Sequence, residues 1–215
     1  MHADLLSALP QNGRLTLGPG AWLLAGFASK RADELVAEVH RIAEAAPFRF
    51  MTTRGGHTMS VAMTNCGDVG WVTDRAGYRY AATDPLSGLH WPAMPPLFRE
   101  LAKQAAAAGG FPDFSPDACL INRYAPGARM SLHQDRDERD LDAPIVSVSL
   151  GLPAAFLFGG QRRSDRPRRV LLRSGDVGVW GGPSRLAFHG IGPLPPGSDP
   201  LCGPYRFNLT FRTAL

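Results

Sequence analysis

Apolar residues recur every three or four positions in two segments of the first half of the chain, a spacing typical of one face of an α-helix. The first helix is predicted over residues 29–46, with apolar side chains at positions 35, 36, 39, 42, 43 and 46, and Pro47 ends it. The second is predicted from about residue 95 to residue 108, and Gly109 and Gly110 provide its stop signal. The intervening residues 48–92 indicate hairpins or irregular structure.

After residue 115 the pattern changes to short apolar runs separated by Gly, Pro and Asp, which predict β-strands. We expect eight strands, at residues 118–124, 130–135, 145–150, 155–159, 169–173, 176–181, 185–190 and 205–212. Strands of this length and spacing predict a mainly β fold with flanking helices (α+β), built as an antiparallel sandwich, barrel or jelly roll. The two helices are expected to cover one outer face of a sheet.

The composition is that of a soluble globular protein, with 44% hydrophobic and 20% charged residues among 215. No apolar run reaches the roughly 18 residues of a membrane-spanning helix, and the N-terminus lacks a basic segment followed by an apolar one. Cys66, Cys119 and Cys202 are odd in number and far apart, which argues against a disulfide framework or a CxxC zinc site. We therefore expect a cytoplasmic protein with reduced thiols and no membrane association.

Positive charge is concentrated in one short segment. The chain has a net charge of +4 and a pI near 9.3, and the segment QRRSDRPRR (161–169) alone carries five Arg against one Asp. A basic run of this kind favours a polyanionic partner, although such runs are also common at solvated hairpin tips.

Candidate metal ligands occur in the predicted strand 130–135. His133 and Asp135 lie two residues apart, so their side chains should share one face of a strand. The pair alone is compatible with an ordinary charged loop, but His189 lies in another late predicted strand and supplies a third ligand. Two histidines and one carboxylate form the facial triad of non-haem Fe(II) enzymes, which leaves coordination positions open.

Two other predicted strands carry polar side chains on a face that should be buried. In the last strand the apolar residues Phe207, Leu209 and Phe211 alternate with the polar residues Arg206, Asn208, Thr210 and Arg212. The strand 118–124 places Leu120, Asn122 and Tyr124 on one face. These polar residues could merely satisfy sheet edges and loops. An arginine on such a face could also bind the far carboxylate of 2-oxoglutarate with two hydrogen bonds.

Together these segments resemble the AlkB family of Fe(II)- and 2-oxoglutarate-dependent dioxygenases. The resemblance covers roughly residues 45–215. It is carried by TMSVAMTNCGDVGW (58–71), RAGYRY (75–80), GGFPDFSPDACLINRY (109–124), NRYAPGARMSLHQDRDE (122–138), IVSVSLGLPAAFLFGG (145–160), His189 and RFNLTFR (206–212).

The resemblance implies a double-stranded β-helix, a variant of the jelly roll, at residues 116–215. Residues 1–115 would form helices and a nucleotide-recognition lid in the same structural unit. Iron binding, and with it catalysis, is implied for His133, Asp135 and His189. Binding of 2-oxoglutarate is implied for Asn122, Tyr124, Arg206, Asn208 and Arg212. Substrate binding is implied for Met63, Trp71, Tyr78, Asp137 and Arg163.

The implied activity is oxidative dealkylation of N-alkylated bases, such as 1-methyladenine and 3-methylcytosine, as direct-reversal repair of DNA damage. Such an enzyme consumes Fe(II)-activated O2 and 2-oxoglutarate and releases succinate, CO2 and formaldehyde. Its partner would be alkylated single- or double-stranded DNA, with RNA as a second candidate, and a monomer is the default expectation. The base must leave the stack to be reached, and a Trp71 face can replace stacking worth about 1–3 kcal/mol. Asp137 would favour a cationic lesion electrostatically.

Other readings of the same residues stay open at this point. Met63 and Trp71 could be ordinary core residues between a helix and a sheet. An enzyme with the same iron site could hydroxylate a protein or a small molecule instead of a base. A jelly roll without catalytic activity could bind nucleic acid and use the two histidines and the aspartate to hold a structural zinc ion.

Overall fold

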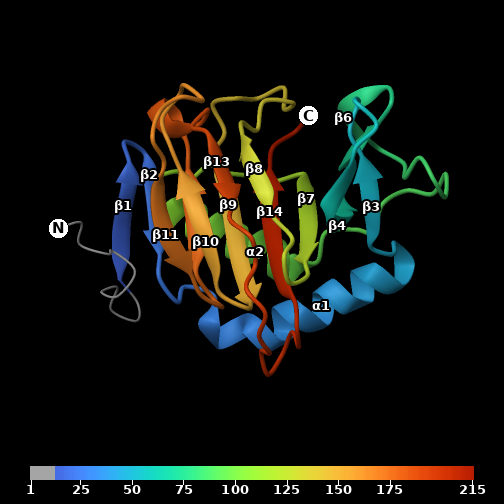
Figure 1. The fold of residues 1–215 in the computed structure, drawn as a ribbon, viewed down its shortest axis with the longest axis horizontal. Helices are drawn as coiled ribbons and strands as arrows, with labels where there is room; N and C mark the ends of the chain where they lie inside the picture. Colours follow the sequence, from blue (N-terminus) through green and yellow to red (C-terminus); the bar gives the residue numbers. More distant parts are fainter. Residues whose placement is uncertain (1–12) are drawn as a thin grey trace.

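Three antiparallel sheets form most of the protein (Figure 1), which is described by a computed structural model over residues 13–215. The large sheet has eight strands in the order β1-β2-β12-β9-β14-β7-β4-β3, and the small sheet has four in the order β11-β10-β13-β8. Strands β5 and β6 pair only with each other. The bounds are β1 Arg14–Gly18, β2 Ala21–Leu24, β3 Arg49–Thr52, β4 Thr58–Gly67, β5 Gly70–Asp74, β6 Gly77–Ala81, β7 Ala118–Tyr124, β8 Met130–His133, β9 Ile145–Gly151, β10 Ala154–Phe158, β11 Arg168–Leu172, β12 Val177–Trp180, β13 His189–Ile191 and β14 Arg206–Arg212.

Both predicted helices are confirmed, and they cover the outer face of the large sheet (Figure 1). The first is helix α1, Ala32–Ala45, which follows the 3-10 turn η2, Ser29–Arg31; the second is α2, Pro96–Ala108. A further 3-10 turn, η3, spans Gly182–Ser184. No helix within residues 13–215 combines the length and the apolar character needed to cross a bilayer.

The alternation of apolar and polar residues predicted for the last strand determines which face of β14 each side chain occupies. Phe207, Leu209 and Phe211 point toward the helices and are almost completely buried, and Phe211 meets Phe98 of α2 edge to face at 5.9 Å. Burying each such side chain contributes about 1.5–3 kcal/mol. The polar side chains of β14 therefore point to the opposite face, into the space between the large and the small sheet.

A second apolar cluster fills much of the space between the two sheets. It joins Trp180 and Ile145 of the large sheet to Phe156 and Phe158 of the small sheet. Two sheets that face each other over one core, with helices on the outside of the larger sheet, agree with the predicted jelly roll. The rest of the space between the sheets is lined by polar residues and holds the site.

The structure corrects the predicted strands in three places. The strand expected at 130–135 ends at His133, and the one expected at 185–190 is wrong for residues 185–188, because β13 comprises only His189–Ile191. The strands β1 and β2 were not predicted, since each has at most five residues and a glycine-containing turn joins them. Strands from both sides of residue 115 lie in the large sheet, with β4 pairing directly to β7.

Candidate active site

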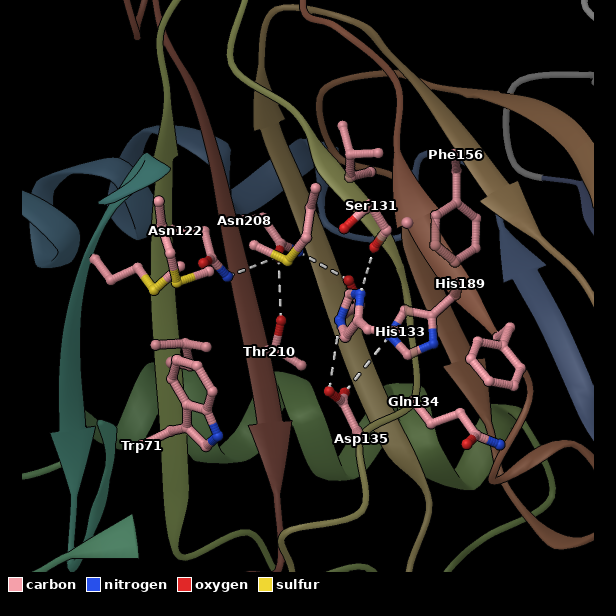
Figure 2. Close-up of a pocket in the computed structure, with 18 of the residues that line it drawn as sticks. Trp71, Asn122, Ser131, His133, Gln134, Asp135, Phe156, His189, Asn208 and Thr210 are labelled. Carbon is pink, nitrogen blue, oxygen red and sulfur yellow. Dashed lines mark hydrogen bonds and ion pairs between the residues drawn. The ribbon is translucent and has the colours of Figure 1, made fainter. Parts of the chain in front are cut away.

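One cavity of about 510 Å³ lies between the two sheets, and every site residue expected from the sequence lines it. Figure 2 shows its interior, with side chains from both sheets and from the β5–β6 hairpin pointing toward one another. The expected residues in its wall are Met63, Trp71, Tyr78, Asn122, Tyr124, His133, Asp135, Asp137, Arg163, His189, Arg206, Asn208 and Arg212. Met63 and Trp71 are therefore part of the cavity wall as well as of the packed interior.

The two histidines and the aspartate converge on one point (Figure 2). His133 at the end of β8 lies directly opposite His189 at the start of β13 in the antiparallel pair. Their ligand atoms and those of Asp135 all lie within 4.8 Å of one another, and each Nε2 is 3.6 Å from an Asp135 oxygen. The three ligands come from neighbouring segments, so they would approach a metal ion from one side and leave its other coordination positions open.

Hydrogen bonds fix which nitrogen of each histidine faces the metal position. Nδ1 of His133 lies 2.9 Å from the carbonyl oxygen of Ser131, and Nδ1 of His189 lies 3.0 Å from that of Ala187. A carbonyl oxygen can only accept, so each Nδ1 carries a proton and each Nε2 is the ring nitrogen left to bind a metal. Burial, together with the neighbouring His189 ring, lowers the pKa of His133 to about 4, so the ring is neutral near pH 7.

Asp135 is held as a carboxylate by a buried arginine. Burial alone would raise the pKa of Asp135, but the Arg212 guanidinium outweighs this and, with His189, holds that pKa well below its usual range. Arg212 Nη2 donates to Asp135 Oδ2 at 2.7 Å. The prediction that His133 and Asp135 project together is confirmed, but Asp135 lies beyond the end of β8 and not in a strand. Its position comes from these side-chain contacts instead.

Arg206 is a buried charge without a carboxylate partner. Its side chain is 1% exposed, and its Nη2 donates to Ser149 Oγ at 3.0 Å. The Cζ atom of the guanidinium lies 5.0 Å from the centroid of the Tyr124 ring. Its Nε and Nη1, like Oδ1 of Asn122, have no hydrogen-bond partner among residues 13–215. A buried guanidinium is costly unless an anion pairs with it. Arg206 lines the cavity and has N–H groups to spare for a carboxylate, so the residues present suit 2-oxoglutarate.

The remaining polar residues of β14 have different surroundings. Asn208 accepts hydrogen bonds at Oδ1 from Asn122 and Thr210, and its Nδ2 donates to Ser147 Oγ and to the carbonyl oxygen of Val148. Its amide is fully used inside the protein and serves to orient Asn122. Of the two arginines of β14, Arg206 thus has donors to spare, whereas Arg212 is committed to ion pairs.

Aromatic side chains of the β5–β6 hairpin form the mouth of the cavity. Trp71 stacks on Tyr78 with ring centroids 5.6 Å apart and an angle of 19° between the rings, and Tyr78 is 51% exposed. Trp71 Nε1 donates to Asp137 Oδ2 at 2.9 Å. Arg163, from the basic segment 161–169, lies in the same wall. The mouth therefore combines flat apolar faces with a carboxylate and a cation.

Four residues around this site were not singled out from the sequence as site residues. Asn65 is completely buried and pairs with both backbone groups of Trp71 at 3.0 Å, so it fixes the start of the hairpin. The others, Tyr80, Glu138 and Arg185, form a buried network beside Asp135. No spacing rule marks Tyr80, Glu138 or Arg185, because their partners lie 47 to 58 residues away in the chain.

A jelly roll whose cavity holds two histidines, one aspartate and an unpaired arginine has the features of an Fe(II)- and 2-oxoglutarate-dependent oxygenase. Comparison with known proteins agrees. The profile of the 2OG-Fe(II) oxygenase superfamily matches residues 20–212. The chain belongs to this superfamily and, within it, to the AlkB family.

The relatives that place it there cover almost its whole length. Alpha-ketoglutarate-dependent dioxygenase AlkB of Salmonella typhimurium is 60% identical, with 92% of each chain covered, and AlkB of Escherichia coli is 59% identical over the same shares. The solved structure of OsALKBH1 superimposes with a TM-score of 0.81 at 30% identity, covering 94% of this chain and 100% of that one.

Proposed function

We propose that this protein is an Fe(II)- and 2-oxoglutarate-dependent dioxygenase that oxidatively removes alkyl groups from nucleic-acid bases. The observation that carries the proposal is the cavity itself. A His133–Asp135–His189 cluster, the unpaired Arg206 guanidinium and the Trp71 ring face one space of about 510 Å³. Its three parts suit a metal, a dicarboxylate and a flat base. The full-length AlkB relatives support the same activity.

The proposed iron ligands are His133, Asp135 and His189, through their Nε2 atoms and a carboxylate oxygen. Ferrous iron bound there, with O2 and 2-oxoglutarate, supplies the oxidation that hydroxylates the alkyl carbon and converts 2-oxoglutarate to succinate and CO2. The protein's part is to keep His133 neutral and Asp135 ionised, and to orient all three ligands. A hydroxylated N-methyl group then leaves as formaldehyde, and its hydroxyl proton returns to the nitrogen, which restores the base.

The proposed 2-oxoglutarate site lies deeper in the same cavity. Arg206 would bind one carboxylate of 2-oxoglutarate with its spare N–H groups, with Tyr124 beneath its guanidinium and Asn122 in the same cavity wall. Asn208 supports this position by orienting Asn122. Arg212 would act through Asp135, whose orientation it fixes.

The proposed substrate is a cationic N-alkylated base, of the 1-methyladenine or 3-methylcytosine type, taken out of the stack. Trp71 and Tyr78 would contact its faces, Met63 its edge, and Asp137 would stabilise its positive charge. Arg163 and the adjoining arginines would hold phosphates. We propose alkylated DNA in single or double strands as the main substrate, RNA as a second one, and a monomeric enzyme in the cytoplasm.

The experiment that tests this proposal measures stimulation of succinate release by different substrates. With Fe(II) and 2-oxoglutarate present, a single-stranded oligonucleotide with one 1-methyladenine is expected to stimulate release well above an unmodified oligonucleotide. The N6-methyladenine isomer, which is neutral at pH 7, is expected to stimulate less because it gains nothing from Asp137. Equal stimulation by a methylated peptide or a small-molecule substrate would favour the alternative, a hydroxylase that acts on other substrates.

The variant Trp71→Ala serves as the control for base recognition in this assay. Loss of one stacking face costs about 1–3 kcal/mol, so the KM for the 1-methyladenine strand should rise about 5- to 150-fold. Release of succinate without nucleic acid should stay close to the wild-type rate, since the side-chain hydrogen bond and the ring stacking of Trp71 are with Asp137 and Tyr78 and not with a residue of the metal cluster. An unchanged KM would remove Trp71 from the base site.

A further inference from the structure

A buried carboxylate that the proposed reaction does not use lies beside the metal cluster. The Glu138 side chain is 2% exposed. Its Oε1 accepts from Tyr80 Oη at 2.6 Å and lies 3.2 Å from Arg212 Nε, and its Oε2 accepts from Arg185 Nη2 at 3.0 Å. Both oxygens are thus occupied by donors, and Glu138 does not line the cavity. Its contacts are with protein rather than with substrate.

Two of these donors also hold Asp135. Arg212 is paired with the Asp135 carboxylate at 2.7 Å, and Arg185 donates from Nη1 to the Asp135 backbone oxygen at 2.7 Å. Arg185 itself lies four residues before His189 in the chain. Two carboxylates and two guanidinium groups therefore form a buried network that is balanced in charge. Asp135, a proposed iron ligand, is one of its four members.

The third donor belongs to the hairpin that forms the cavity mouth. Tyr80 on β6 is the direct cross-strand partner of Trp71 on β5. The two residues bind consecutive positions of one loop: Trp71 binds Asp137 and Tyr80 binds Glu138. Burial raises the pKa of the Tyr80 hydroxyl well above its usual range, so this group remains a donor. The hairpin is therefore attached to the loop that starts at Asp135.

We propose that Tyr80 and Glu138 are positioning residues that couple the base-binding hairpin to the iron ligand Asp135. A ligand that immobilises Asp135 also immobilises its partner Arg212. Because Arg212 pairs with Glu138, the same ligand strengthens the hydrogen bond between Glu138 and Tyr80, and with it the attachment of the hairpin. The inference rests on the proposed function for the assignment of the metal to Asp135 and of the base to the hairpin. Coupling between two binding events is reciprocal, so a docked hairpin in turn strengthens metal binding.

Hydrogen exchange tests this coupling without turnover. Backbone amide exchange of residues 70–81 is measured with and without Mn(II) and 2-oxoglutarate, under anaerobic conditions and in the absence of nucleic acid. We expect these ligands to slow exchange in the hairpin of the wild-type protein by at least about fivefold, the lower end of ordinary coupling between sites. The variant Tyr80→Phe removes a single hydroxyl and is expected to abolish most of this slowing.

Reciprocity supplies a second measurement on the same variant. Tyr80→Phe should weaken the binding of Mn(II) and 2-oxoglutarate, measured by calorimetry, by the same factor by which it reduces the protection of the hairpin. Glu138→Gln removes the charge that pairs with Arg212 and should have the larger effect. Tyr205→Phe is the matched control, because Tyr205 lies on the helix side of the sheet and contacts only Arg123 and Phe207 among aromatic and cationic partners of the described residues.

Each outcome of the exchange experiment either supports the coupling or overturns it. Slowing that is lost in Tyr80→Phe and kept in Tyr205→Phe supports the coupling. Slowing that persists in Tyr80→Phe, that is absent from the wild-type protein, or that is lost equally in Tyr205→Phe overturns it. None of these measurements uses an alkylated base. A failure of the dealkylation assay with intact coupling would therefore refute the proposed substrate and leave the coupling between the hairpin and Asp135 supported.

Discussion

His133→Ala is expected to reduce succinate release by more than about 100-fold, the upper limit of the effect of residues that merely orient a metal ligand. His133 supplies one of three ligand atoms that lie within 4.8 Å of one another, and within residues 13–215 only His189 joins it as a histidine of the cavity wall. Weaker binding of Fe(II), measured by calorimetry or by Co(II) absorption, should accompany the loss. His133 is the most informative position because its side chain lies in the cavity wall and outside both apolar clusters, so its truncation leaves the core intact.

The matched control for this variant is His90→Ala. His90 is exposed, lies outside the cavity and contacts the carbonyl oxygen of Ala82. It should retain wild-type succinate release. If His133→Ala keeps more than about a tenth of the activity at saturating Fe(II), the cluster is not the metal site of the reaction, because a tenfold change corresponds to only about 1.4 kcal/mol.

Arg206→Met is expected to lower the affinity for 2-oxoglutarate without lowering the stability of the protein. The Arg206 guanidinium is buried without a carboxylate partner, so replacing it by an apolar chain of similar length removes an unpaired charge from the interior. Thermal unfolding of the ligand-free variant should occur at a temperature equal to or above that of the wild-type protein. Affinity for 2-oxoglutarate should fall about 30- to 1,000-fold, the equivalent of roughly 2–4 kcal/mol for a desolvated charge pair.

A second variant distinguishes charge from geometry at the same position. Arg206→Lys keeps the positive charge but cannot donate from two nitrogens in one plane, so it should recover only part of the affinity for 2-oxoglutarate. Both variants should abolish or reduce the thermal stabilisation that 2-oxoglutarate gives the wild-type protein. An Arg206→Met variant with a lower unfolding temperature and an unchanged KM for 2-oxoglutarate would mean that Arg206 has a structural role only.

The period-two pattern of the strand residues 206–212 carried most of the site prediction. It placed Phe207, Leu209 and Phe211 against the helices and Arg206 in the cavity, as the structure has them. The strength of this signal is physical, since a strand buried on both faces has no reason to carry arginines unless something pairs with them. The helices were predicted for a similar reason, because their buried residues recur at the helical spacing.

Other parts of the site depend on contacts that a linear pattern does not contain. Asp135 was predicted in a strand, yet its position is set by Arg212, 77 residues away in the chain. Glu138 stands in the charged run DRDERD and has the sequence signature of a solvated loop, although it is buried between two arginines. Arg185 was predicted in a strand and lies in a turn, where it reaches back across 50 residues to Asp135.

The most direct test of the proposed activity is the mass of a methylated oligonucleotide after incubation with the protein, Fe(II), 2-oxoglutarate and O2. For a single-stranded DNA with one 1-methyladenine, we predict the loss of the mass of one methylene group, with formaldehyde released in equal amount. The loss should be absent with His133→Ala and without 2-oxoglutarate. An oligonucleotide of unchanged mass, recovered while the wild-type protein continues to convert 2-oxoglutarate to succinate, would contradict the assignment of a nucleic-acid base as the substrate.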